Sequence, residues 1–275
     1  SDVCSSDLMQ PGRRPGALPR LAEYAALDAL ALVTAGAVQV AMHGPSDVFS
    51  GTGALALGLS ADPVTAVMAL LVGFVGWIVV RYSRTYLDGE AREGAFHGLM
   101  LATVAAVLVL VQAATLAVLV GAFVAIGLAM KRLLLFYAER AEARRAATKF
   151  ALVWGAGDVA LVAASALLWN AYGTAEIGAI LAEAGAGLPL AAQVATGLLV
   201  LTALLKTAAF PLHGWLTEVM EAPTPVSALL HAGIINAGGV LMIRFAETMQ
   251  ASPGAMAALV MLGGFTALFG ALVML

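Results

Sequence analysis

The sequence predicts an all-α fold, a polytopic bundle of about eight transmembrane helices. Apolar residues make up 61% of the 275 residues and charged residues only 11%, against about 25% charged residues in ordinary soluble domains. The apolar residues also come in runs of about twenty, the length that crosses about 30 Å of hydrocarbon. The chain therefore has too little polar surface to cover a water-soluble fold.

The composition also argues against several kinds of site. The net charge of −3 is small, and the basic residues are too few and too scattered for a nucleic-acid surface. The single cysteine, Cys4, excludes a disulfide framework and any multi-cysteine metal site. No P-loop, dinucleotide fingerprint, catalytic triad or zinc motif appears. We therefore expect no metal and no cofactor, and a transporter or proton channel rather than an enzyme, although membrane enzymes also bury acids and bases.

The chain divides into a leader and eight apolar runs. Residues 1–20 do not resemble a signal peptide, because no basic region precedes an apolar core, so we expect a non-native or cytoplasmic leader. The predicted spans are Leu21–Met42, Pro63–Tyr82, Ala95–Val111, Thr115–Tyr137, Phe150–Trp169, Leu188–Phe210, Pro225–Phe245 and Ala255–Leu275. The last run is still apolar where the sequence stops, so we expect a fragment of a longer protein; the alternative is a natural terminus buried at the membrane surface.

The placement of Lys and Arg predicts the orientation. With a cytoplasmic amino terminus, the basic residues fall in the inner segments, including the cluster from Arg140 to Lys149. The outer loops at 43–61, 112–114 and 170–187 hold no Lys or Arg, and only Arg244 falls at an outer end.

Two of the predicted outer loops have sequence patterns that indicate secondary structure. Residues 48–59 (VFSGTGALALGL) are Gly-rich and apolar, and we expect a small hairpin there. Residues 175–184 (AEIGAILAEA) have the amphipathic pattern of an interfacial helix. An ordinary loop is the alternative in both places.

Lys206 is the residue that most clearly breaks the apolar rule, since it lies in LLVLTALLKTAAFPLHGWL. An ionisable group within a span costs on the order of 2.5–3.5 kcal/mol on insertion scales. Burial disfavours the ammonium and a nearby charge restores it, so a lysine poised in this way can load and release a proton. Pro211 favours this interpretation, because it breaks the helix just after Lys206. The alternative is a snorkelling lysine whose ammonium reaches the interface.

His231 and Asp158 also lie inside apolar runs, in PTPVSALLHAGIINAGG and FALVWGAGDVALVAA. The imidazole of His231 suits a proton relay near neutral pH; a neutral histidine bonded to a neighbouring helix is the alternative. Asp158 fits the counter-ion of a buried lysine or a link in a proton path. Its alternative is a structural bond to Trp154 or to a backbone group.

Glu218 and Glu221 lie in HGWLTEVMEAPTP, a segment that reads as a re-entrant or broken helix. Pro223 stops one helix and Pro225 suits the first turn of the next. The two acids are candidates for the mouth of a water-filled path, and a solvated loop is the alternative. The residues alone thus predict a bundle with a polar lysine–histidine track at mid-membrane depth.

The stretch LLKTAAFPLHGWLTEVMEAPTPVSALLHAGIINAGGVLMIRFAE resembles the signature of the proton-translocating antiporter-like family. That family includes membrane subunits of respiratory complex I and of Mrp-type antiporters. The pattern K-[ST]-A-x-x-P-x-x-x-W-L-x-x-x-M-x-[AG]-P-T-P-V-S-A-L-x-H-A is long and specific, and weaker similarity covers residues 58–275. Within the family, the ending HAGIINAGG is most similar to DabB, the membrane subunit of an inorganic carbon uptake system that works with a large soluble partner, DabA.

The resemblance implies an antiporter-like fold built from inverted five-helix repeats. Residues 21–93 would form the first two helices and an outer loop, residues 94–248 one five-helix repeat with a broken helix, and residues 249–275 the truncated start of a second repeat. Lys206 matches the proton-carrying lysine of the broken helix, His231 the histidine of the following helix, and Asp158 the aspartate of the helix that leaves the basic loop.

The function implied is a proton-conducting subunit of a bacterial inner membrane that energises uptake of bicarbonate or CO2 with a soluble DabA-like partner. An Mrp-type cation/proton antiporter or complex I subunit is one alternative, and a non-conducting membrane anchor is another. Complex I and Mrp subunits carry a glutamate that pairs with the lysine, yet Val124 falls near that place here. Gly155 likewise stands where an arginine is often found. These two departures fit the carbon-transport branch better, or else a degraded paralogue.

Overall fold

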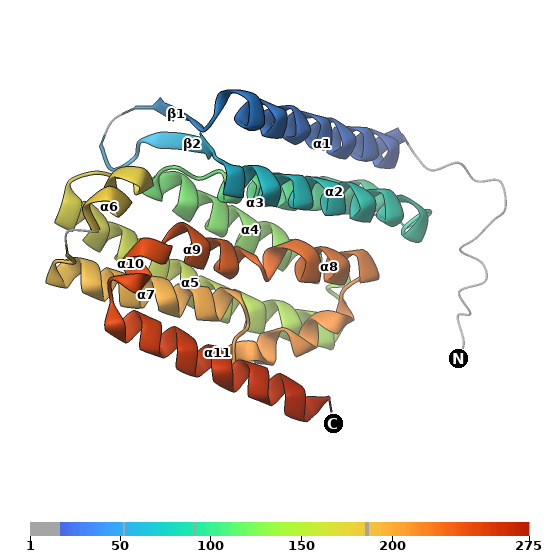
Figure 1. Ribbon diagram of the computed structural model, residues 1–275. Coiled ribbons are helices and arrows are strands. Elements are labelled where there is room, and N and C mark those ends of the chain that lie inside the picture. Colours follow the sequence, from blue (N-terminus) through green and yellow to red (C-terminus); the bar gives the residue numbers. More distant parts are fainter. Residues whose placement is uncertain (1–16, 52, 91, 185–186, 275) are drawn as a thin grey trace.

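A computed structural model describes residues 17–51, 53–90, 92–184 and 187–274, except for the side chains of Met220, Glu221 and Ala232. The helices run side by side as a layered bundle, and a two-stranded hairpin lies across one end (Figure 1). The predicted helical membrane fold is confirmed, since six helices of the described ranges are long and apolar enough to cross a membrane.

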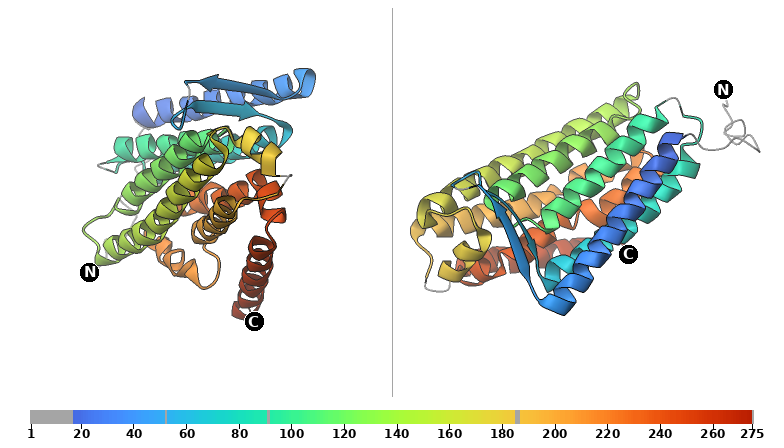
Figure 2. Two further views of the ribbon diagram at one scale, coloured as in Figure 1. Left: turned by 90° about the vertical axis from the view of Figure 1, so that its left-hand side faces the viewer. Right: turned by 90° about the horizontal axis from the view of Figure 1, so that it is seen from above.

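The six long helices begin and end near the predicted spans. They are α1 (Ala17–His43), α2 (Pro63–Tyr86), α3 (Glu93–Val111), α4 (Leu116–Leu134), α5 (Ala141–Tyr172) and α11 (Pro253–Val273). Helices α1 and α11 lie at opposite edges of the bundle, with the other helices between them (Figures 1 and 2). Helix α5 begins nine residues before the predicted Phe150, because the Ala, Glu and Arg residues of the basic segment are good helix formers.

The two remaining predicted spans are shorter or interrupted. Helix α7 (Leu190–Lys206) ends four residues before the predicted Phe210. The span predicted from Pro225 to Phe245 is divided into α8 (Thr224–Leu229), a π-helical turn η4 (Leu230–Ile234) and α9 (Ala237–Arg244). Two short 3-10 turns, η2 (Leu212–Trp215) and η3 (Thr217–Glu221), join α7 to α8. The chain is therefore broken between Lys206 and α8, as the prolines predicted.

The ends of the long helices follow from local sequence. Asp62 caps α2 by accepting a hydrogen bond from the backbone N–H of Thr65 at 2.8 Å, and its own N–H donates to Thr65 Oγ1 at 2.7 Å. Pro63 occupies the first turn, where no N–H is needed. Helix α5 stops at Gly173, which has a left-handed φ of 68°.

The predicted hairpin is confirmed as strands β1 (Ser46–Ser50) and β2 (Leu57–Ala61), which pair antiparallel. The α3–α4 connection runs beside it, because Ser60 N–H donates to Gln112 O at 2.7 Å and Ala114 N–H donates to Gly58 O at 3.0 Å. The predicted amphipathic segment forms helix α6 (Ile177–Ala184) at the same end (Figure 1). The three loops without Lys or Arg therefore meet at one end of the bundle, while the α2–α3 and α4–α5 loops lie at the other.

Candidate functional site

Lys206 is the last residue of α7, at the point where the chain leaves the helix. Its side chain is completely buried, with an exposed fraction of 0%. Pro211 lacks the N–H that a longer helix would need, and Ala208 adopts a left-handed φ of 53°, which costs a non-glycine residue on the order of 1–3 kcal/mol. The break thus leaves the ammonium inside the bundle, so the snorkelling alternative is wrong.

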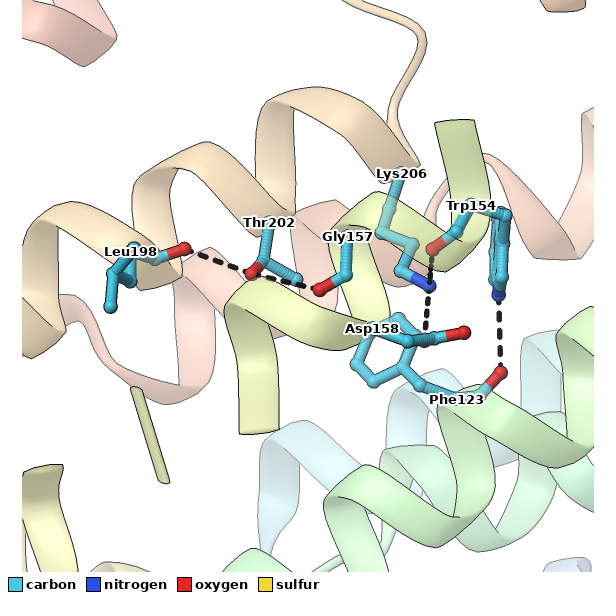
Figure 3. Close-up of polar contacts among 7 residues, drawn as sticks. All are labelled: Phe123, Trp154, Gly157, Asp158, Leu198, Thr202 and Lys206. Carbon is cyan, nitrogen blue, oxygen red and sulfur yellow. Dashed lines mark hydrogen bonds and ion pairs between the residues drawn. The ribbon is translucent and has the colours of Figure 1, made fainter. Parts of the chain in front are cut away.

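Asp158 of α5 is the ion partner of this lysine (Figure 3). Lys206 Nζ donates a hydrogen bond to Asp158 Oδ1 at 2.5 Å and another to the carbonyl oxygen of Trp154 at 3.0 Å. Trp154 and Asp158 are four residues apart, and therefore lie one above the other on the same face of α5. The Asp158 side chain keeps 19% of its area exposed, so the pair has one enclosed and one partly accessible member.

Two aromatic rings complete the surroundings of the ammonium. Lys206 Nζ lies 3.9 Å from the centroid of the Trp154 ring and 5.1 Å from that of Phe123 on α4. Both distances are within the range of about 6 Å in which a ring face attracts a cation. Helices α4 and α5 together therefore offer the lysine a carboxylate, a carbonyl oxygen and two ring faces in place of water.

Close contact between α5 and α7 depends on Gly157. A Cβ atom at this position would lie 2.9 Å from Lys206 Cε, closer than real Cβ atoms come to other heavy atoms. Beside it, Thr202 Oγ1 donates to Leu198 O at 2.8 Å and lies 3.3 Å from Gly157 O (Figure 3). The missing side chain lets the lysine stem pass between the helices and reach Asp158.

The arrangement can hold one proton in two ways. The buried pair exists either as ammonium and carboxylate or as amine and carboxylic acid, and transfer of one proton between Nζ and Oδ1 interconverts the two. Only the ionic form carries separated charges, whose burial is expensive. Asp158 is the partly exposed member of the pair, whereas the lysine side chain is enclosed.

The structure does not bring His231 to this pair. His231 lies on the π-helical turn η4, and its side chain is exposed. No contact between described residues joins it to Lys206 or Asp158. The predicted lysine–histidine track is therefore not formed by direct contact, and a role for His231 stays a prediction.

The predicted acids of the broken segment lie elsewhere. Glu218, on η3, forms an ion pair with Lys149 near the start of α5, and its Oε2 atom is buried without a hydrogen bond to the described part of the chain. The side chain of Glu221 lies outside the described residues. That Glu218 and Glu221 line the mouth of a path also stays a prediction.

Three residues of the site and the broken segment were given no functional role in the sequence analysis, which named Trp154 only as an alternative bond partner of Asp158. Trp154 could have been found there, because it lies one turn from Asp158 on the same helix face. Phe123 gave no signal, since nothing local links α4 to Lys206. His213 lies on the broken segment, with its ring centroid 5.8 Å from that of Phe210 and 4.7 Å from that of Phe269 on α11. Its Nδ1 atom is buried without a hydrogen-bond partner in the described ranges.

The structure also locates the two positions that depart from the family pattern. Val124 has an exposed side chain, while its neighbour Phe123 turns its ring toward the lysine. A Cβ atom at Gly155 would meet nothing within 4 Å. The carboxylate of the pair therefore comes from α5, through Asp158, and α4 contributes an aromatic face.

Comparison with known proteins gives two family matches. Residues 113–275, more than half of the chain, match the family described as the transmembrane part of NADH:quinone oxidoreductase and Mrp antiporters. Residues 49–97 match the N-terminal family of complex I NADH-ubiquinone oxidoreductase chain 5.

Individual relatives agree with these matches. The chain is 40% identical over 236 residues to the probable inorganic carbon transporter subunit DabB2 of Halothiobacillus neapolitanus, which is 85% of this chain and 43% of that protein. It is 34% identical over 221 residues to NADH-quinone oxidoreductase subunit L of Mycobacterium tuberculosis, which is 78% of this chain and 34% of that protein. The chain thus spans less than half the length of these relatives.

A solved structure of the Mrp complex from a Dietzia species superposes with a TM-score of 0.78 at 30% identity. The superposition covers 92% of this chain and 31% of the Mrp chain. An archaeal membrane-bound sulfane sulfur reductase superposes with a TM-score of 0.76 at 18% identity, covering 88% of this chain and 54% of that one, and so shares the fold.

Proposed function

The chain belongs to the NADH:quinone oxidoreductase/Mrp antiporter family, and from this premise we propose that it is a proton-conducting membrane subunit whose carrier is Lys206. The observation that carries the proposal is the enclosed Lys206–Asp158 pair at the broken end of α7. Burying an ammonium in hydrocarbon costs free energy. A role in proton transfer explains why the lysine is nevertheless buried beside a carboxylate with which it can exchange a proton.

The second part of the proposal concerns the substrate whose uptake the proton flux drives. We infer that proton flux through this subunit energises uptake of bicarbonate or CO2 by a large soluble DabA-like partner at a bacterial inner membrane. The 40% identity to a probable inorganic carbon transporter subunit supports this. The absence of an acid at Val124 supports it as well, because the ion partner of the lysine is here Asp158 on α5.

The test is uptake of labelled bicarbonate by cells that carry the full-length protein and its partner. Lys206→Ala should lower uptake roughly a hundredfold, the lower end of what loss of a proton-transferring group costs. Lys131→Ala is the matched control, since Lys131 is an exposed lysine in the last turn of α4 and its loss should leave uptake unchanged. Undiminished uptake in Lys206→Ala would falsify the role proposed for this lysine.

Cation/proton exchange is the second candidate, favoured by the superposition on the Mrp complex. It predicts that an imposed sodium gradient drives proton movement in vesicles containing the full-length chain. Sodium-independent proton movement supports the carbon-uptake proposal instead. A membrane anchor without conduction would bind its partner and yet show no chain-dependent proton permeability.

A further inference from the structure

The indole ring of Trp154 lies against the Lys206 ammonium, beside its two hydrogen-bond acceptors. The ring centroid is 3.9 Å from Nζ, and the same residue accepts a hydrogen bond from Nζ through its backbone carbonyl. We propose that Trp154 is a positioning residue, whose ring is fixed by α4 and holds the ammonium against Asp158. This inference rests on the proposed function of Lys206 as a proton carrier.

Helix α4 sets the orientation of the ring. Trp154 Nε1 donates a hydrogen bond to the backbone oxygen of Phe123 at 3.2 Å (Figure 3). Gly127, one turn further along α4, leaves the space that the indole fills, since a Cβ atom there would lie 2.5 Å from Trp154 Cδ1. The hydrogen bond and the space at Gly127 both favour the observed placement of the ring.

Two more rings pack against the indole, one from α5 itself and one from the broken segment. Phe150 stacks on it with a centroid distance of 5.1 Å, and Trp215 of η2 meets it edge-on at 6.4 Å. Trp154 and Trp215 are each 2% exposed and Phe150 is 1% exposed. The indole is therefore buried and packed against two further rings beside the ammonium.

The consequence for proton transfer follows from the chemistry of the ring face. A ring face attracts an ammonium strongly and a neutral amine hardly at all. Lys206 Nζ lies 2.5 Å from Asp158 Oδ1 and 3.9 Å from the centroid of the Trp154 ring. The ring therefore keeps the ammonium within hydrogen-bonding distance of the carboxylate that receives its proton. Without the ring, Nζ keeps its two hydrogen-bond acceptors. It loses the ring face that holds it close to them.

The first experiment measures proton flux in vesicles containing the full-length chain, under an imposed membrane potential. Trp154→Leu removes the ring face and should lower the flux about tenfold. Trp154→Phe keeps a ring face without the N–H, and should restore most of that loss. Trp169→Leu, on the same helix but beside the outer loops, is the control and should conduct normally. Equal flux in Trp154→Leu and wild type would overturn the proposal.

A second pair of variants moves the ring without changing it. Gly127→Ala should displace the indole and lower the flux, as Trp154→Leu does. Gly121→Ala adds the same methyl group to the same helix, where a Cβ atom meets nothing within 4 Å, and should have no effect. Equal flux in the two alanine variants contradicts the positioning role.

A double-mutant cycle separates positioning from simple core packing. Thermal unfolding in detergent is measured for wild type, Trp154→Leu, Lys206→Met and the double variant. Positioning predicts that Trp154→Leu destabilises more when Lys206 is present than when Met replaces it. Additive effects would show a packing role alone and overturn the inference. The cycle reports on the ring–ammonium contact even if Lys206→Ala conducts normally, in which case the proposed function fails independently.

Discussion

At Lys206, the cost of burying a charge is offset by groups from two neighbouring helices. Removing one member of a buried ion pair typically costs about 3–5 kcal/mol, because the other charge is left uncompensated. Asp158 supplies the opposite charge, Trp154 an oxygen and a ring face, and Phe123 a second ring. Gly157 leaves room for the lysine side chain beside these partners, since a Cβ atom there would lie 2.9 Å from Lys206 Cε.

Gly157→Ala tests this dependence on space at the residue scale. The added methyl group should push on the lysine stem, destabilise the protein by about 1–3 kcal/mol as overpacked cores do, and lower proton flux. Gly155→Ala is the matched control on the same helix, and should be neutral or stabilising by up to about 1 kcal/mol, because alanine is the better helix former. Thermal unfolding and vesicle flux measure both effects, and similar behaviour of the two variants would show that the close approach at Gly157 is unimportant.

At the scale of elements, the end of α9 is tied to the start of α2. Arg244 Nη1 donates to Asp62 Oδ2 at 2.7 Å, and Nη2 donates to Ala113 O at 3.1 Å. Arg244 is the one basic residue that the orientation rule placed at an outer end, and this contact explains its presence. The pair lines a cavity of about 390 Å³ between the hairpin and α6.

The Asp62–Arg244 ion pair should make the free energy of unfolding depend on pH in the acid range. Burial alone would raise the pKa of Asp62, but hydrogen bonds from Thr65 N–H and Arg244, with the charge of Arg244, hold that pKa below its usual 3.8. The stabilisation is therefore complete above the unfolded-state pKa and is lost as the pH falls through the lower folded-state pKa.

We expect Asp62→Asn to lower the free energy of unfolding by about 1 kcal/mol at neutral pH, the range for a partly exposed charged hydrogen bond. It should also remove part of the destabilisation that we expect as the pH falls from the unfolded-state pKa through the lower folded-state pKa. Thermal unfolding across this range measures both effects. The control is Asp47→Asn, because Asp47 is exposed on β1; an identical pH profile for both variants would contradict the role of the Asp62–Arg244 pair.

At the scale of the whole molecule, the loops alternate between two ends of one bundle. The Lys- and Arg-free loops join through the hydrogen bonds of the hairpin, the α3–α4 connection and the residues before α6. At the opposite end, Arg84 pairs with Glu23 and Tyr137 donates to Glu90 at 3.2 Å. This separation agrees with the distribution of basic residues, and the positive-inside rule predicts that the basic end faces the cytoplasm.

Cysteine labelling tests the orientation. Cys4, the single cysteine of the sequence, is first replaced by Ser in the full-length protein. An impermeant maleimide added to intact cells should then label Ala182→Cys on α6 and leave Arg145→Cys on α5 unlabelled, because both positions are exposed but lie at opposite ends. Both should react after permeabilisation, and the reverse pattern would show that the amino terminus lies outside.

The sequence by itself determined the membrane-spanning segments, the hairpin between the first two of them, the break after Lys206 and the choice of Lys206 and Asp158 as candidates. These depend on hydropathy and on Pro and Gly, whose effects act within a few residues. Only the tertiary structure decided that Lys206 meets Asp158 and the rings of Trp154 and Phe123, and that His231 lies apart from them. Trp154 and Lys206 are 52 positions apart and Phe123 and Trp154 are 31 apart. Contacts over such separations depend on how each helix is rotated and packed, which no local pattern encodes.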